Sequence, residues 1–126
     1  MHQDTSNNYE LIFVYGTLRN GCSNHRLIAH AECLGQGRSQ RSFSLYLGDF
    51  PYAVSQEATG PIRGEVYRVN QDTRLQVDLL EGHPHWYCRQ KETICLDSGE
   101  LVQAWIYFFP EPRGRLVPSG DFLDAE

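Results

Sequence analysis

The chain has 126 residues and a formal net charge of −5 at neutral pH, and its lysines and arginines are scattered rather than clustered. This length suits one domain with a substantial core. An acidic chain without a basic cluster lacks the electrostatic footprint of a protein that binds nucleic acid or an anionic membrane, so we expect neither partner. The polar start and the short first apolar run predict a cytoplasmic protein without a membrane span.

The first strand and the turn after it are the most informative part of the N-terminal region. Residues 1–9 are polar and are expected to form a disordered lead-in. Leu11–Tyr15 is an apolar run typical of a buried strand, and Gly16 ends it abruptly. Backbone N–H groups beyond such a strand lack ladder partners and can bind an anion or a carbonyl oxygen. Gly16 also lets a ligand approach the backbone, although a plain turn is the simpler interpretation.

The following segment favours a short helix and then strands. Ser23 can cap a helix that begins near Asn24, with Leu27, Ile28 and Ala31 on one side, and Gly35 ends this region. Alternating apolar residues then predict strands at 43–47, 52–56 and 62–69.

Gly64, in the middle of the strand expected at 62–69, indicates either a bulge or a close approach of another backbone.

A second helix follows the strand that ends near residue 69. Asn70 is placed to be its N-cap, and Asp72 suits the positive end of the helix. Leu75, Leu79 and Leu80 predict its apolar stripe, with Val77 off that stripe.

The end of this helix is predicted at Gly82, which favours the left-handed conformation, and Pro84 prevents continuation. Glu81 therefore lies in the last turn. The negative end of the helix and partial burial would both raise the pKa of its carboxyl group toward neutrality, as general acid–base chemistry requires. A solvated glutamate at a helix end is the simpler alternative.

Residues 87–96 and 101–109 form a predicted hairpin around the turn at 97–100, and the segment 111–126 is expected to be an irregular tail. The elements together predict an α+β fold: a single domain over residues 10–110, with a curved mixed or antiparallel sheet or small β-barrel and two short helices.

Three sequence blocks resemble the gamma-glutamylcyclotransferase-like family, especially its gamma-glutamylamine cyclotransferase branch. The first is Tyr15-Gly16-Thr17-Leu18 with Asn24-His25, and the second is Gly64-Glu65-Val66-Tyr67. The third is Asp78-Leu79-Leu80-Glu81-Gly82, followed by Tyr87-Cys88-Arg89. They occur in the order seen in the family and span most of the chain.

The resemblance implies an enzyme that needs neither metal nor cofactor and acts on a small-molecule gamma-glutamyl substrate. The α-amine of the glutamyl group attacks its own γ-carbonyl, which releases an amine and 5-oxoproline. Glu81 would be the general base and acid, and the turn formed by Tyr15, Gly16, Thr17 and Leu18 would bind the glutamyl end.

Two tyrosines on the hairpin, Tyr87 and Tyr107, are candidates to place hydroxyl groups near Glu81, although packing alone explains such residues equally well. Residues 83–86 are candidates to border the site of the leaving amine, whose identity the sequence does not give.

Three alternatives remain open at this point. One is a metal site built from the ligand-type residues His25, His30, Cys33, His83, His85 and Cys88, which lack the usual metal-binding spacings. Another is a hydrolase that uses Cys22 and His25 as nucleophile and base. The third is a domain of the same fold that binds a small ligand or regulates without turnover. The four cysteines are expected to be free thiols.

Overall fold

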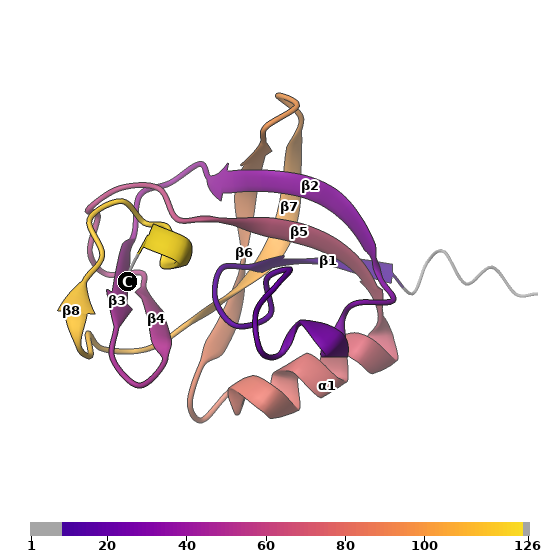
Figure 1. Ribbon diagram of the computed structural model, residues 1–126, viewed down its shortest axis with the longest axis horizontal. Coiled ribbons are helices and arrows are strands. Elements are labelled where there is room, and N and C mark those ends of the chain that lie inside the picture. The colour runs from indigo at the N-terminus through magenta and orange to yellow at the C-terminus, as the bar shows by residue number, and fades with distance from the viewer. Residues whose placement is uncertain (1–8, 125–126) are drawn as a thin grey trace, which may run out of the picture.

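In the computed structural model, which describes residues 9–124, five strands close into a barrel (Figure 1). In order around the barrel these are β1 (Tyr9–Val14), β5 (Arg63–Asn70), β2 (Glu32–Ser39), β6 (Cys88–Leu96) and β7 (Leu101–Phe108). Neighbouring strands are antiparallel except β1 and β7, which close the barrel in parallel where Ile12 pairs with Trp105. The expected α+β domain with a small barrel is confirmed.

A separate three-stranded sheet stands at one end of the barrel (Figure 1). It contains β4 (Pro51–Val54), β3 (Ser44–Leu47) and β8 (Arg115–Leu116). The C-terminal segment is therefore more ordered than expected: β8 pairs with β3, Val117 is buried, and a 3-10 turn follows at Phe122–Asp124. The lead-in expected at 1–9 lies outside the described residues except for Tyr9, which begins β1.

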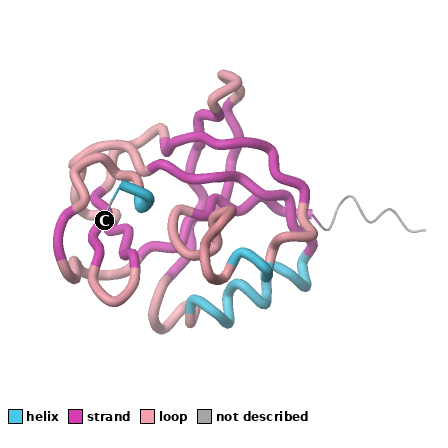
Figure 2. Tube along the Cα trace, viewed as in Figure 1, coloured by secondary structure: helices cyan, strands magenta, loops and turns pink. Residues whose placement is uncertain are grey.

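One α-helix, α1 (Gln71–Glu81), lies along the barrel beside a 3-10 turn at His25–Leu27 (Figure 2). Two short helices were expected, so the first is reduced to a single turn. The residue at its N-cap is Asn24 rather than Ser23, and no side chain caps it. For α1 the predicted cap is confirmed, because the Asn70 side chain accepts a hydrogen bond from the Thr73 N–H at 2.8 Å.

The buried face of α1 differs from the predicted leucine stripe. Val77 is fully buried, whereas Leu75 and Leu80 are about half exposed and Leu79 is 82% exposed. Thr73 and Asp78 are the other buried residues of the helix. The stripe assignment was wrong because polar contacts of Thr73 and Asp78 accompany Val77 on the face against the barrel.

Two buried clusters occupy opposite faces of the barrel strands. One includes Phe13, Val66 and Ile106 and continues to the small sheet through Leu45. The other includes Ile12, Tyr67 and Val77 and lies where α1 and the loop after β1 cover the barrel. Adjacent residues of β1 and β5 thus enter different clusters, as the alternation of side chains along a strand requires.

Glycines explain two local features of the barrel. A Cβ at Gly64 would lie 2.3 Å from the Val14 carbonyl oxygen, so its role is close approach rather than a bulge. Gly35, expected to end a helical region, instead lies in β2 with φ of 133° beside a register shift. No helix within residues 9–124 is long and apolar enough to cross a bilayer.

Candidate active site

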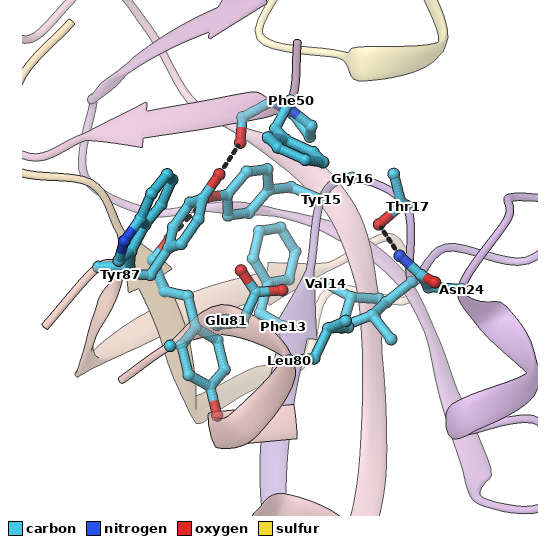
Figure 3. A pocket seen from close by; sticks show the side chains of 15 residues that line it. Phe13, Val14, Tyr15, Gly16, Thr17, Asn24, Phe50, Leu80, Glu81 and Tyr87 are labelled. Carbon is cyan, nitrogen blue, oxygen red and sulfur yellow. Dashed lines mark hydrogen bonds between the residues drawn. The ribbon is translucent and has the colours of Figure 1, made fainter. Parts of the chain in front are cut away.

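A cavity of about 340 Å³ opens where the end of β1, the start of β4 and the end of α1 meet (Figure 3). All the site residues expected from the sequence line this one cavity: Tyr15, Gly16, Thr17, Leu18, Glu81, Tyr87 and Tyr107. They come from segments up to 92 residues apart in sequence, as the hydrogen bond between Tyr15 and Tyr107 illustrates.

Glu81 is the last residue of α1, and Gly82 ends the helix in the left-handed conformation with φ of 68°. The Glu81 side chain extends into the cavity, near Phe13 and below Tyr15 (Figure 3). Within residues 9–124 its carboxyl group has no hydrogen-bond or ion-pair partner. Burial raises the pKa of this carboxyl group to about 7, from an ordinary value of 4.5. Glu81 can therefore both accept and donate a proton near neutral pH.

The loop after β1 presents backbone donors on the other side of the cavity. Among contacts between described residues, the N–H groups of Gly16, Thr17 and Leu18 donate to no protein acceptor, although Leu18 is buried. The loop is closed by the Arg19 N–H, which donates to the Gly16 carbonyl at 3.0 Å. Successive free N–H groups of this kind form a site for a carboxylate or carbonyl oxygen.

Gly16 has a structural role beside the expected one, which stays a prediction. A Cβ at this position would lie 2.5 Å from Cγ of Pro51. The absent side chain lets the loop pack on Pro51, whose carbonyl oxygen accepts the Tyr87 hydroxyl at 2.8 Å. Gly16 thus joins the loop to the opposite wall of the cavity.

Asn24 lines the cavity and is bonded to the loop, although the sequence offered it only as the start of a short helix and as part of a family motif. Its side-chain amide donates to the Thr17 hydroxyl at 2.9 Å (Figure 3). Its backbone N–H donates to the Thr17 carbonyl at 2.8 Å. Both contacts hold Thr17, so the Thr17 hydroxyl supports the loop.

The three tyrosines of the site use their hydroxyl groups for structure. Tyr15 donates to the Tyr107 carbonyl at 2.6 Å and accepts from the Ala53 N–H at 3.2 Å. Tyr87 donates to Pro51, and Tyr107 donates to the Asp78 carboxylate. Tyr87 and Tyr107 thus line the cavity with Glu81, but their hydroxyl groups donate to other acceptors, so a direct part for them in the site stays a prediction. Burial raises the pKa of all three phenols, so they stay neutral.

Asp78 contrasts with Glu81 on the same helix. Burial opposes its ionisation, but hydrogen bonds from Tyr107, Arg89 and Arg74 outweigh that effect and lower its pKa. The arginine contacts measure 3.0 Å from Arg89 Nε and 2.7 Å from Arg74 Nη1. Asp78 is thus an ionised structural anchor.

The mouth of the cavity is apolar. Phe50, Leu80 and Trp86 line it and are each about half exposed. The sequence singled out 83–86 for this border, and only Trp86 of that segment lines the cavity. Phe50 was missed, because nothing in the sequence places the β3–β4 turn opposite the end of α1.

The residues proposed for metal binding or thiol chemistry are placed elsewhere. Among residues 9–124, no group of three or more His, Cys, Asp or Glu side chains is arranged to hold a metal ion. His25 is engaged through Nδ1 with the Leu18 carbonyl at 3.0 Å. Burial raises the pKa of the Cys22 thiol, which disfavours the reactive thiolate. All four cysteines are free, as expected.

Comparison with known proteins agrees with this architecture. The family model described as gamma-glutamyl cyclotransferase, AIG2-like, matches residues 12–124. The chain therefore belongs to that family, which confirms the resemblance seen in the sequence blocks.

Individual relatives match over most of their length. The chain is 44% identical to a Methanocaldococcus jannaschii protein provisionally named a gamma-glutamylcyclotransferase, covering 91% of this chain and 97% of that one. It is 36% identical to the gamma-glutamylcyclotransferase family protein YtfP of Escherichia coli K12, covering 91% and 97%. The crystal structure of the uncharacterized protein PH0828 from Pyrococcus horikoshii superposes with a TM-score of 0.73 at 29% identity, covering 91% of each chain.

Proposed function

We propose that this chain is a gamma-glutamylcyclotransferase that converts a gamma-glutamyl amine into 5-oxoproline and the free amine. The observation that carries the proposal is the unpaired Glu81 carboxyl group, with a pKa of about 7, in the same cavity as the free N–H groups of residues 16–18. A proton carrier and an oxygen-binding loop are the two groups this reaction needs, since the substrate brings its own nucleophile.

Binding would place the glutamyl end against the loop. The N–H groups of Gly16, Thr17 and Leu18 are suited to hold its α-carboxylate or the γ-carbonyl oxygen. Such backbone donors are fixed before the substrate arrives, so they need no reorganisation. The half-exposed side chains of Phe50, Leu80 and Trp86 then face the leaving amine.

Glu81 would begin the reaction as a base. It removes a proton from the α-ammonium group, and the resulting amine attacks the γ-carbonyl carbon to close a five-membered ring. Negative charge moves to the γ-oxygen, where a backbone N–H can stabilise it. An intramolecular attack held in this geometry has a high effective molarity, so positioning supplies much of the acceleration.

Glu81 would complete the reaction as an acid. The ring nitrogen loses a second proton as it becomes the lactam nitrogen, and the departing nitrogen gains a proton as its bond to the γ-carbon breaks. One carboxyl group that carries these protons in turn must have a pKa near the working pH, which burial of Glu81 provides. The products are 5-oxoproline and an amine.

The direct test mixes the protein with a panel of gamma-glutamyl amines and measures 5-oxoproline. Release from at least one member is expected. If gamma-glutamyl compounds bind but none releases 5-oxoproline, the chain is a small-ligand-binding or regulatory domain of this fold instead.

Replacement of the proposed proton carrier gives a second test. Glu81→Gln keeps the shape of the side chain but removes its charge, so kcat should fall by about 10²–10⁴-fold with substrate binding retained. Glu100→Gln, an exposed change of the same type in the hairpin turn, is the matched control and should leave kcat unchanged. Near-normal turnover by Glu81→Gln would show that another group moves the protons.

A further inference from the structure

The loop that presents the free N–H groups is attached to a buried arginine. Arg19 is 1% exposed and follows Leu18 directly, and its own N–H closes the turn onto Gly16. Its guanidinium group lies between two carboxylates, 3.3 Å from Glu65 through Nε and 2.8 Å from Asp121 through Nη1. Both side-chain contacts are therefore made by the residue that directly follows the three free N–H groups.

Glu65 does not hold Arg19 alone. Its Oε1 atom accepts the Asn20 N–H at 2.9 Å and the Tyr67 hydroxyl at 2.9 Å, while Oε2 accepts Arg19 Nε. The Nη1 atom of Arg19 depends on Asp121. Without Asp121 a charged donor in a buried place would lose its acceptor, and such a donor moves toward water or another acceptor.

Asp121 itself is held in a docked segment. Its Oδ1 atom also accepts the Leu123 N–H at 2.9 Å, which starts the 3-10 turn at Phe122–Asp124. The preceding Gly120 accepts the Arg63 N–H at 2.8 Å, and its φ is +73°. A Cβ at Gly120 would lie 2.1 Å from the Pro61 carbonyl oxygen, so the segment fits closely against the start of β5.

We propose that Asp121 is a positioning residue for substrate binding: through Arg19, it fixes the loop whose N–H groups receive the glutamyl end. This inference rests on the function proposed above for that loop. The C-terminal segment then contributes to the site without touching the substrate. Helix α1 carries Glu81 and has no hydrogen bond or ion pair with Asp121, so binding and proton transfer should respond separately.

The test compares Asp121→Ala and Asp121→Asn with Asp124→Ala, a nearby exposed aspartate in the same turn. KM for a gamma-glutamyl amine should rise about tenfold in Asp121→Ala and less in Asp121→Asn, as expected for a lost charged hydrogen bond. The value of kcat should stay within about twofold. Asp124→Ala should match the wild type. An unchanged KM in Asp121→Ala, measured well below its unfolding temperature, would refute the positioning role.

A second readout does not depend on turnover. The backbone amide NMR signals of Gly16, Thr17 and Leu18 in the free protein should shift in Asp121→Asn and stay in place in Asp124→Ala. Asp121→Asn keeps an oxygen that can accept the Leu123 N–H. If Asp121→Ala does not fold, the comparison of Asp121→Asn with Asp124→Ala is the test. If the wild type releases no 5-oxoproline, the proposed function fails, while these amide signals still decide whether Asp121 positions the loop.

Discussion

Glu81 and Asp78 show how two carboxyl groups on one helix acquire different properties. Two arginines and one tyrosine donate hydrogen bonds to Asp78 and lower its pKa. Burial without a described partner raises the pKa of Glu81. One group is thereby fixed as an anion, and the other can change its protonation state near neutrality. This separation of pKa values is the pattern by which acid–base groups are distinguished from structural ones.

At the residue scale, the contact between Gly16 and Pro51 gives a prediction. Gly16→Val would force Pro51 away, because even a Cβ would lie 2.5 Å from its Cγ. We expect affinity for 5-oxoproline, measured by calorimetry, to fall about tenfold, since overpacking of this kind costs about 1–3 kcal/mol. Gly60→Val is the matched control, because a Cβ there meets no atom within 4 Å. Equal affinities in the two variants would argue against the loop as the binding site.

At the scale of elements, helix α1 is anchored by few contacts. Val77 is its fully buried apolar side chain, and the ion pairs of Asp78 tie the helix to β6 through Arg89. The leucines that suggested a stripe lie toward solvent and the cavity mouth instead, where Leu80 lines the pocket. The cap residues Asn70 and Gly82 identified both ends of the helix, but the leucine periodicity did not identify the face that packs.

This orientation of α1 predicts opposite results for two truncations. Val77→Ala should lower the free energy of unfolding by about 2–3 kcal/mol, because it leaves a cavity in the second buried cluster. Leu79→Ala should change it by less than about 0.5 kcal/mol, since the side chain is 82% exposed. Urea unfolding of both variants measures the difference. A larger loss for Leu79→Ala would mean that the helix packs by its leucine face.

At the scale of the whole molecule, closure of the barrel creates the site. The loop after β1 and the end of α1 lie far apart in sequence, and pairing of β1 with both β5 and β7 brings them to one cavity. The C-terminal segment then returns to pair β8 with β3 and Asp121 with Arg19. The site therefore depends on segments from the whole length of the described chain.

The raised pKa of Glu81 predicts how the stability of the whole protein depends on pH. The folded protein retains the Glu81 proton up to about pH 7, whereas the unfolded chain releases it near 4.5. This contribution to stability is complete below 4.5 and is lost as the pH rises through 7. Glu81→Gln stays neutral, so its stability relative to the wild type should increase between pH 4.5 and 8, on the order of 1–3 kcal/mol.

Chemical denaturation of both proteins at the two pH values measures this change. Contributions from Asp78 and other shifted groups are common to both proteins and cancel in the difference. A stability difference that is the same at pH 4.5 and 8 would mean that the Glu81 carboxyl group is well solvated.

The sequence by itself determined the elements with strong local signals. Asn70 and Gly82 delimit α1, the turn at 97–100 defines the hairpin, and ordered motifs identify the family and place Glu81 at the end of a helix. These features depend on residues close together in the chain, such as a cap and the N–H that it binds. Features that depend on neighbouring residues can therefore be predicted before the fold is known.

The tertiary structure decided what depends on distant partners. Strand β2, with few apolar residues, exists because β5 and β6 pair with it on either side. The acceptors of the Tyr107 and Tyr87 hydroxyls, the Asp78 carboxylate and the Pro51 carbonyl, are likewise set by the fold. Only packing decides that arginines pair with Asp78 while Glu81 stays unpaired in a cavity. Desolvation and ion pairing depend on the groups that surround a residue in the folded protein.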